Sequence, residues 1–315
     1  MAERIATVFG ASGFIGRYVV KRLAAQGYHV RVAVRDTESA MFLKPMGAIG
    51  QVVLLHTAVT EPDAVTRAIA GAETVINLVG MLAEKKTGDF KRVHEDAAGL
   101  IASTAAAHGV RHLVHLSALG ASAASPSLYA RSKAAGEAAV RAAFPAAVIL
   151  RPSVVFGYED AFFNRFARMA QLLPTLPIIA AATKFQPVYV ADVADAVIAG
   201  LKPAFAGKTF ELGGPAVMTM REVLEYVQDE TDRLSCMLPL PMWYMKLWGM
   251  LLEKLPGQLL TRDQLILLGR DNVLTVGIPG LPELGITPTP VEAVVPAYLH
   301  RYRPGGGKID RYKAA

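Results

Sequence analysis

The first half of the chain alternates short apolar runs with segments of helical spacing. The apolar runs are rich in β-branched residues, which is typical of strands buried on both faces of a parallel sheet. The segments between them repeat apolar residues every three or four positions, as helices do, and Gly27 and Gly109 follow two of them at the position that favours glycine. The predicted strands are Ile5–Phe9, His29–Val34, Val52–Leu55, Thr74–Leu78, His112–Ser117 and Ala147–Arg151, and the predicted helices are Phe14–Gln26, Pro62–Ala70, Phe90–His108 and Tyr129–Ala143.

This alternation predicts an α/β fold with a doubly wound parallel sheet. After Arg151 prolines gather and strand signals become scarce. We expect residues 1–157 to form a first domain whose sheet is completed by parts of 186–212. Residues 158–185 and 213–303 then form a smaller, mostly helical lobe, and residues 304–315 a flexible basic tail. In the second half the predicted helices are Phe162–Leu173, Met220–Thr231, Met242–Leu255, Arg262–Leu268 and Pro290–Tyr302, and the predicted short strands are Val188–Val190 and Thr209–Leu212.

A glycine-rich loop follows the first predicted strand and opens the first predicted helix. Its glycines, Gly10, Gly13 and Gly16, have the spacing G-x-x-G-x-x-G. Without a Cβ they allow a tight turn, the close approach of a pyrophosphate, and close packing of the helix on the sheet. Backbone N–H groups and the positive end of the helix then face the phosphates. The motif predicts a dinucleotide-binding site, which also includes Ser12, Phe14 and Ile15 in the loop, and Leu78, Val79 and Gly80 at the end of the fourth predicted strand.

The end of the second predicted strand bears on which nicotinamide cofactor the site takes. An NAD site usually carries an acidic residue here, which accepts hydrogen bonds from the adenosine ribose. In this chain Arg35 comes first and Asp36 second, and Arg17 directly follows the last glycine of the loop. A guanidinium can hold a 2′-phosphate through charge-assisted hydrogen bonds. The pattern favours NADP(H), while Asp36 leaves NAD(H) open, and solvated surface charges are the alternative for both arginines.

Tyr129 and Lys133 form a Y-x-x-x-K pair at the start of a predicted helix. A spacing of four puts both side chains on one helix face, and Ser117 ends the preceding predicted strand. A nearby ammonium would lower the pKa of the Tyr129 phenol, which could then pass a proton to a carbonyl oxygen held by Ser117. Lys133 would also reach the nicotinamide ribose. All three are candidate catalytic residues and cofactor contacts; the alternative is that they bind the cofactor without turnover.

Composition narrows the classes of protein further. The chain has 315 residues, of which 52% are hydrophobic and 19% charged, and this excludes wholesale disorder and suits one large or two ordinary domains. The single cysteine, Cys236, excludes a disulfide scaffold, and we expect it to be buried and inert. Seven histidines without paired spacing predict no metal site. Residues 301–315 carry four units of the net charge of +6, which argues against a broad nucleic-acid-binding face.

One apolar segment of the second half contains both tryptophans. No apolar run reaches the roughly 18–20 residues of a membrane-spanning helix, and the N-terminus lacks the pattern of a signal peptide. Met242–Leu252 fits an amphipathic helix docked on a membrane surface or a partner protein, with Trp, Tyr and Lys at the interface. It fits equally a helix whose Trp243, Leu247 and Met250 face the core of the small lobe.

Together, the glycine loop and the Ser-Tyr-Lys set resemble the short-chain dehydrogenase/reductase superfamily, of the extended or atypical kind. The second half is similar to one branch of it, which includes the NAD(P)H-binding accessory subunit of respiratory complex I (NADH:ubiquinone oxidoreductase) and its bacterial relatives. The resemblance covers most of the chain. The strings that carry it are Ala143-Phe144-Pro145, Arg151–Gly157, Phe162-Phe163-Asn164, Gln186–Val193, Thr261-Arg262-Asp263 and Leu281–Ile286.

The resemblance implies a Rossmann-type domain that holds NADPH in a mainly structural way. It also implies attachment to complex I near its membrane and quinone region. The protein would then be peripheral, on the cytoplasmic side of a bacterial inner membrane, or on the matrix side if the chain is a processed organellar one. The residues carried over are Gly10, Gly13, Gly16, Arg35, Ser117, Tyr129 and Lys133, with Pro152 to Val155 beside the nicotinamide, of which Pro152 and Val155 are predicted cofactor contacts.

The chain departs from this family at three places. Ser117 is present where the mitochondrial member lacks a serine, which keeps catalysis open. The usual Gly-Asp after the third strand reads His56-Thr57, which weakens the case for an adenine contact there. His94 stands where relatives often carry Asn.

Three functions follow as hypotheses. The first is an NADP(H)-binding accessory or assembly subunit of complex I, with peripheral membrane contact through Met242–Leu252. The second is an NADPH-dependent reductase or isomerase that acts on an apolar substrate in quinone or lipid metabolism. The third is a redox sensor that binds NADP(H) and regulates a partner. We expect neither nucleic acid nor a metal among its ligands.

Overall fold

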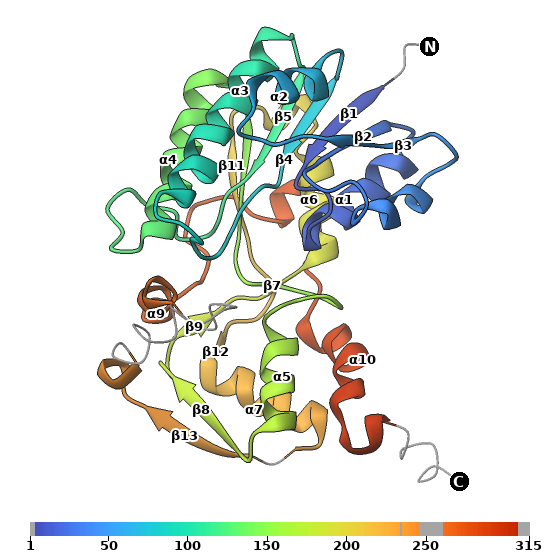
Figure 1. Cartoon of the computed structure of the whole chain (residues 1–315). Helices are drawn as coiled ribbons and strands as arrows, with labels where there is room; N and C mark the ends of the chain where they lie inside the picture. The colour runs from blue at the N-terminus through green and yellow to red at the C-terminus, as the bar shows by residue number, and fades with distance from the viewer. Residues whose placement is uncertain (1–3, 234, 246–260, 308–315) are drawn as a thin grey trace. The chain divides into compact units, whose positions relative to one another are not determined.

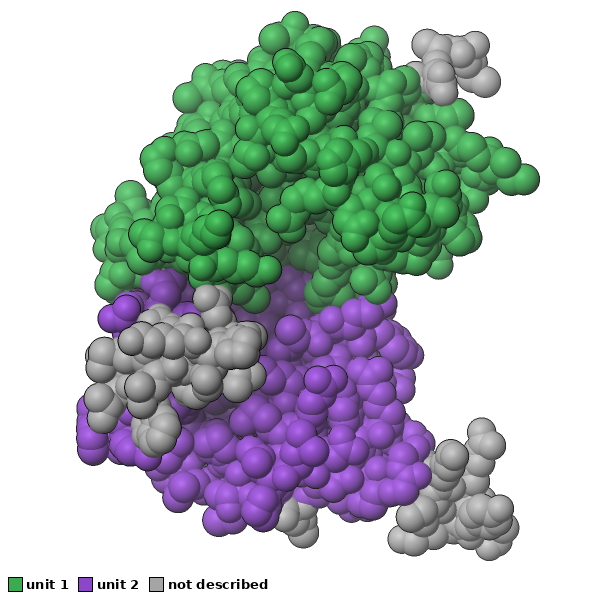
Figure 2. Space-filling view, viewed as in Figure 1, with its two compact units in different colours: residues 1–152, 190–212, 275–287 green, residues 153–189, 213–274, 288–315 purple. Residues whose placement is uncertain are grey.

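The chain folds into two compact units, which Figure 2 colours separately. The computed structural model describes residues 4–233, 235–245 and 261–307. Unit 1 comprises residues 1–152, 190–212 and 275–287, and unit 2 comprises residues 153–189, 213–274 and 288–315. The sequence predicts a first boundary at 157, whereas the chain leaves unit 1 after Pro152 and returns to it twice. The second return contains only the short 3-10 turn Pro282–Leu284, and no sequence pattern pointed to it.

Unit 1 is built on a seven-stranded parallel sheet (Figure 1). The strands are β1 (Ile5–Phe9), β2 (His29–Val34), β3 (Val52–His56), β4 (Thr74–Asn77), β5 (His112–Leu116), β6 (Val148–Pro152) and β11 (Thr209–Leu212). Their order is β11-β6-β5-β4-β1-β2-β3, so the direction of winding reverses between β1 and β4. In such sheets ligands bind beyond the carboxyl ends of the strands at this reversal. The predicted doubly wound α/β fold is confirmed.

Helices cover both faces of this sheet (Figure 1). On one face α1 (Phe14–Ala25) packs against α6 (Val190–Ala199). The other face carries α2 (Pro62–Ile69), α3 (Ala97–Ala107) and α4 (Leu128–Ala143), which contact one another in that order. Burial of apolar surface, worth about 25 cal/mol per Å², holds these layers together. The core under α2, α3 and α4 includes Phe9, Ile69, Ile101, Leu113 and Ile149.

The sequence pattern does not predict α6. Seven of its ten residues are buried, and apolar residues or alanine occupy most positions around the helix. A helix covered on nearly all sides lacks the polar stripe that marks amphipathic spacing. Its exposed side does carry Asp195, which pairs with Arg22 of α1 at an N–O distance of 2.5 Å. This ion pair joins the two helices on their face of the sheet.

The predicted helix Phe90–His108 consists of two elements. The π-helical turn η2 (Lys91–Asp96) precedes α3, and wide turns of this kind often occur at functional sites. The turn lies directly against α4: a Cβ added to Gly136 would be 2.0 Å from the carbonyl oxygen of His94. Only glycine fits there, and its absence of a side chain brings the backbone of His94 onto α4.

Unit 2 combines helices with three two-stranded sheets. β8 (Thr175–Ile179) pairs in parallel with β13 (Cys236–Leu240), and prolines within both strands explain why the sequence does not predict them. The other pairs are β7 (Val155–Phe156) with β10 (Val188–Tyr189), and β9 (Lys184–Phe185) with β12 (Met218–Thr219). The helices are α5 (Phe163–Leu172), α7 (Met220–Thr231), α9 (Arg262–Leu268) and α10 (Val295–Leu299).

The helices of unit 2 follow their local sequence signals. α7 has the predicted bounds, and Thr219 before it forms a capping box with Glu222. The predicted helix Pro290–Tyr302 is broken into α10 and two flanking 3-10 turns. The core between α5, α7 and α10 includes Phe156, Phe163, Val223, Val227 and Tyr298.

Two expectations for the second half are wrong. Cys236 is exposed rather than buried, because β13 is covered little along its length. Trp243 is 70% exposed, which contradicts the interpretation that it faces a core. Leu247 and Met250, the other residues of that interpretation, lie outside the described residues, as does the predicted tail beyond Gly307. No helix in the described part of the chain is long and apolar enough to cross a membrane.

Candidate dinucleotide and Ser-Tyr-Lys site

The glycine loop lies at the carboxyl end of β1, directly before α1. Gly10 has φ +76°, which L side chains rarely adopt, and a Cβ added to it would be 3.0 Å from the carbonyl group of Leu78. A Cβ added to Gly16 would be 2.5 Å from the Ala11 backbone. Gly13 is the N-cap of α1, so the first N–H groups of that helix open toward the loop. Both outer positions of the loop therefore require glycine.

The loop meets the segment that follows β4. Because β1 and β4 are neighbours at the reversal of strand order, Gly10 and Leu78 lie next to each other. Two residues further on, a Cβ added to Gly80 would be 3.3 Å from Nζ of Lys133. The structure thus gathers the glycine loop, the segment after β4 and Lys133 at one edge of the sheet. Ser12, Phe14, Ile15, Leu78 and Val79 are half-buried there.

The Tyr-Lys pair is carried by the first two turns of α4. Ser127 caps this helix by accepting a hydrogen bond from the N–H of Ala130. Nζ of Lys133 donates to the carbonyl oxygen of Leu116, the last residue of β5, at 3.1 Å. The next residue, Ser117, is buried, and its hydroxyl has no hydrogen-bond partner among the described residues. An unpartnered buried hydroxyl costs roughly 1–3 kcal/mol, so Ser117 is suited to bind a ligand atom.

The protonation of the pair differs from the sequence expectation. Burial raises the pKa of Tyr129 to about 12, where the sequence predicts a lowered value. Burial also lowers the pKa of Lys133 to about 8, an effect that the carboxylate of Glu137 partly offsets. A lysine that is itself desolvated and bonded to a carbonyl stabilises a phenolate poorly. At neutral pH Tyr129 is therefore a neutral phenol, the form that donates a proton.

His94 connects three parts of the site through its ring. Nε2 accepts a hydrogen bond from the backbone N–H of Met81 at 3.0 Å, which assigns the ring proton to Nδ1. Nδ1 then donates to Oγ of Ser132 at 2.8 Å, and this hydroxyl donates to the carbonyl oxygen of Tyr129 at 2.8 Å. The ring also stacks on Phe90 and lies edge-on to Tyr129, with centroid distances of 5.3 and 5.6 Å. Sequence reasoning noted His94 only as a departure and missed its partners.

A second buried histidine lies on β5. His115 is in register with Asn77 of β4, whose Oδ1 accepts from the N–H of Val79 and whose Nδ2 donates to Nδ1 of His115. Nε2 of His115 has no hydrogen-bond partner in the described part of the chain. Burial, with the charge of Lys133, lowers the pKa of His115 to about 3. Neither Asn77 nor His115 is among the site residues predicted from the sequence, although a polar side chain inside an apolar strand is a usable signal.

A partly buried ion pair lies one helical turn beyond Lys133. Arg151 of β6 donates to both carboxylate oxygens of Glu137, at 2.8 and 2.6 Å. The carboxylate of Glu211 on β11 lies 3.7 Å from the same guanidinium. This pair ties α4 to the sheet and provides the negative charge nearest to Lys133 along the helix. From the sequence, Arg151 is predicted only to end a strand and to belong to a family string.

The residues predicted to choose between NADP(H) and NAD(H) lie at the carboxyl end of β2 and on α1. Arg35 is exposed directly after β2. Oδ1 of Asp36 accepts from two backbone N–H groups of the following turn, at 3.0 and 3.2 Å. The guanidinium of Arg17 lies 5.0 Å from the ring centroid of Phe42. Part of the Asp36 carboxylate is thus committed to its own turn.

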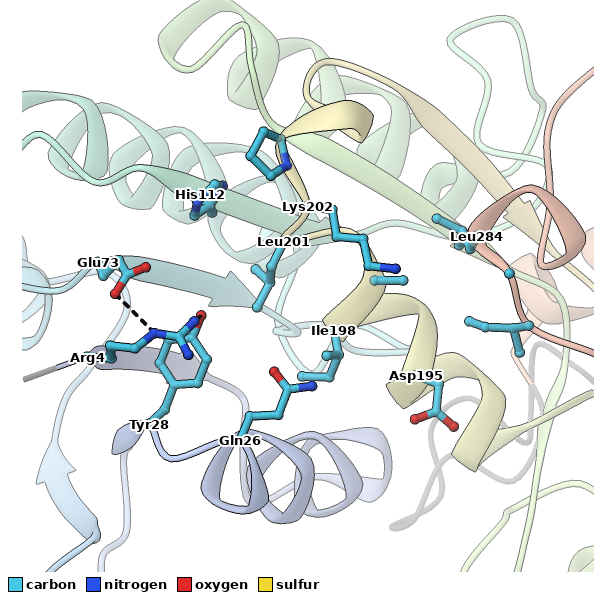
Figure 3. A pocket seen from close by; sticks show the side chains of 14 residues that line it. Arg4, Gln26, Tyr28, Glu73, His112, Asp195, Ile198, Leu201, Lys202 and Leu284 are labelled. Carbon is cyan, nitrogen blue, oxygen red and sulfur yellow. Dashed lines mark hydrogen bonds and ion pairs between the residues drawn. The ribbon is translucent and has the colours of Figure 1, made fainter.

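Two predicted cofactor contacts fall in different units. Pro152 is buried at the end of β6 in unit 1, whereas Val155 belongs to β7 in unit 2. A cavity of about 530 Å³ in unit 1 lies elsewhere, at the amino ends of the strands (Figure 3). Arg4, Tyr28 and Glu73 line it, and none of the predicted site residues does.

A doubly wound sheet with a glycine loop at its reversal of strand order defines the class of Rossmann-type dinucleotide-binding proteins. The model of the NAD dependent epimerase/dehydratase family matches residues 6–213, well over half of the chain. The chain belongs to this family.

The curated relatives include mitochondrial NADH dehydrogenase subunits and a ceramide reductase. The chain is 43% identical over 230 residues to NADH dehydrogenase (ubiquinone) 1 alpha subcomplex subunit 9, mitochondrial, of Arabidopsis thaliana, an alignment of 71% of this chain and 57% of that protein. It is 39% identical over 254 residues to the mouse protein of the same name, covering 78% and 67%. It is also 34% identical over 198 residues to a ceramide reductase of Caulobacter vibrioides, covering 63% and 61%. The chain thus spans about three fifths to two thirds of the length of these relatives.

Solved structures share the fold. MoeE5 in complex with UDP-glucose and NAD superposes with a TM-score of 0.72, covering 98% of this chain and 99% of that one, at 16% sequence identity. At that identity the similarity establishes the architecture alone.

Proposed function

We propose that this chain is an NADP(H)-binding accessory or assembly subunit associated with respiratory complex I, in which the cofactor is mainly structural. The observation that carries the proposal is the similarity to complex I subunits over most of the chain. A ligand that binds only the folded state stabilises it, by about 2.7 kcal/mol at a hundred times its Kd. A bound dinucleotide would in this way hold the edge of the sheet in one conformation.

The choice of NADP(H) is supported at the adenosine end of the site. Exposed Arg35 offers a guanidinium where the 2′-phosphate of an NADP(H) would lie, with Arg17 as a second cation. Asp36, the residue that would favour NAD(H), is engaged in its own turn. The glycine loop follows β1 and directly precedes α1, the arrangement that binds the pyrophosphate of a dinucleotide.

The residues at the nicotinamide end have distinct tasks in this proposal. When bound, the nicotinamide would supply or accept a hydride. The unpartnered Ser117 hydroxyl would bind an oxygen of the ligand, and Lys133 would donate to ribose hydroxyls as well as to Leu116. A general acid is most effective when its pKa lies near the working pH. The raised pKa of Tyr129, about 12, lies far from it and supports a structural cofactor.

We place the protein as a peripheral subunit near the membrane and quinone region of complex I. It would lie on the cytoplasmic side of a bacterial inner membrane, or on the matrix side if the chain comes from an organelle. The exposed ring of Trp243 supports docking through Met242–Leu252, because indole rings favour membrane interfaces and protein contacts.

A reductase is the second candidate. The ceramide reductase relative favours it, and the chain keeps Ser117, Tyr129 and Lys133 together. In this function the enzyme is NADPH-dependent and acts on an apolar carbonyl or quinone compound. The neutral phenol of Tyr129 would donate its proton to the substrate oxygen.

Turnover separates the two candidates. The purified protein is titrated with NADPH and then assayed for NADPH oxidation with quinones and long-chain keto compounds. We expect NADPH binding with no turnover above background, and Tyr129→Phe should bind as the wild type does. Tyr28→Phe, at the opposite edge of the sheet, is the matched control. Turnover that Tyr129→Phe abolishes and Tyr28→Phe retains would replace the structural proposal with the reductase.

A further inference from the structure

The ring of His94 forms hydrogen bonds to two separate elements, the segment after β4 and helix α4. On one side it accepts from the N–H of Met81, in the segment after β4. On the other side it donates to Ser132, which in turn donates to the backbone of Tyr129 on α4. Both nitrogens of the imidazole are thus used, one as acceptor and one as donor. This requires a neutral ring with its proton on Nδ1.

Its surroundings hold the ring in this state. His94 is 2% exposed, stacked on Phe90. Burial, and then the charge of Lys133, lower the pKa of His94 to about 3, so the ring stays neutral at physiological pH. The backbone is fixed as well, because Gly136 brings α4 against the carbonyl oxygen of His94.

The peptide that His94 holds lies near Lys133. A Cβ on Gly80 would be 3.3 Å from Nζ of Lys133 and 3.8 Å from Nε2 of His94. Gly80 and Met81 share a peptide bond, so the hydrogen bond to Met81 determines how far Gly80 stands from the lysine. If that bond were lost, the segment could move away from α4.

We infer that His94 is a positioning residue that clamps the Gly80–Met81 peptide to α4 and so shapes the cofactor site before the cofactor binds. The inference rests on the proposed function, because it adds a residue to the same site. His94 acts through its hydrogen bonds to Met81 and Ser132. Of these two, the hydrogen bond to Met81 is the one that affects cofactor binding. An asparagine at this position cannot span the same gap, so the clamp is a property of histidine here.

Two substitutions of His94 distinguish its hydrogen bond to Met81 from its hydrogen bond to Ser132. The amide of asparagine reaches the place of Nδ1 and can keep the bond to Ser132, but it is too short to accept from Met81. The amide oxygen of glutamine reaches the place of Nε2 and can accept from Met81. His108→Asn, at the exposed end of α3, is a matched control for loss of a histidine.

The experiment measures NADPH affinity and the hydrogen-exchange rate of the Met81 amide in the full chain. We expect His94→Asn to weaken NADPH binding about tenfold, the effect of one hydrogen bond worth about 1.4 kcal/mol. The Met81 amide should exchange faster in that variant. His94→Gln should keep both properties within about threefold of wild type, and His108→Asn should change neither. Equal weakening by Asn and Gln, or faster Met81 exchange with unchanged affinity, would overturn the inference.

The wild-type protein provides a test that needs no variant. The clamp predicts a protected Met81 amide in the protein without nucleotide, and rapid exchange there would overturn it. A wild-type protein that binds neither NADPH nor NADH while Met81 is protected would contradict the proposed function, and with it the role of His94 in cofactor binding, but would uphold the hydrogen bond from Met81 to His94. The two failures are therefore distinguishable.

Discussion

Arg35 is the residue on which the proposed choice of NADP(H) depends most. Its exposed guanidinium would pair with the 2′-phosphate, which only NADP(H) carries. We predict that Arg35→Ala weakens NADPH binding by about 1–3 kcal/mol, as for a charge-assisted contact, and leaves NADH binding nearly unchanged. Calorimetric titration with both nucleotides measures this, with Arg67→Ala at an exposed position of α2 as control. Equal losses of binding affinity for NADPH and NADH would show that Arg35 does not bind the 2′-phosphate.

The buried histidines make the stability of the protein sensitive to acid. His94 and His115 both have a pKa lowered from 6.5 to about 3 by burial. Between those values the unfolded chain binds more protons than the folded one, so the free energy of unfolding falls as the pH falls from about 6.5 toward 3. The full effect is on the order of 5 kcal/mol for one such histidine.

We therefore predict that His94→Gln reduces this acid sensitivity. Urea unfolding at pH 7.5 and pH 5 measures it as the change in the free energy of unfolding between the two conditions. On acidification the free energy of unfolding should fall less in the variant than in the wild type. The difference is the contribution of the one proton that His94 binds on unfolding. An identical loss in both proteins would show that His94 does not stay neutral in the fold.

Among the helices and strands, the contact between η2 and α4 is the one that a single substitution would disrupt most. A methyl group at position 136 would overlap the carbonyl oxygen of His94 at 2.0 Å. We predict that Gly136→Ala destabilises the fold by about 1–3 kcal/mol, despite the higher helix propensity of alanine. Gly99→Ala on α3 is the matched control, because its nearest atom is the Cβ of Ala139 at 3.3 Å. Comparable stabilities for the two variants in thermal unfolding would contradict this account.

The elements that the sequence predicts are those whose signal is local. The strands of the first half and α7 carry their own periodicity and caps, and the structure has them within a few residues. α6 is missed because it is apolar nearly all round, and β8 and β13 because they contain prolines. The π-turn η2 is missed because it depends on the contact with Gly136, forty-odd residues away.

The same rule holds within the site. The glycine loop, Tyr129 and Lys133 have fixed spacings along the chain, so sequence analysis singles them out. The Met81–His94–Ser132 chain of hydrogen bonds joins three separate elements, and no spacing encodes it. The pKa of Tyr129 is wrong in the sequence prediction for a related reason: burial decides it, and burial is a property of the folded unit.

At the scale of the whole molecule, each unit is assembled from three separate stretches of chain. Neither unit can be cut out at one point, so the proposed function must be tested on the full chain. The proposed partner surface also belongs to the whole molecule. In the described part of the chain, the exposed Trp243 is one residue that would contribute to it.

In the proposed function the protein works as part of complex I with a bound NADP(H). The most direct measurement is purification of the tagged full-length protein from detergent-solubilised membranes of its native cells. Mass spectrometry identifies its partners, and nucleotide analysis identifies its cofactor. We predict complex I subunits in constant ratio to the chain, with NADP(H) present in proportion. Recovery of the chain without complex I subunits, as a nucleotide-binding protein on its own, would contradict the account.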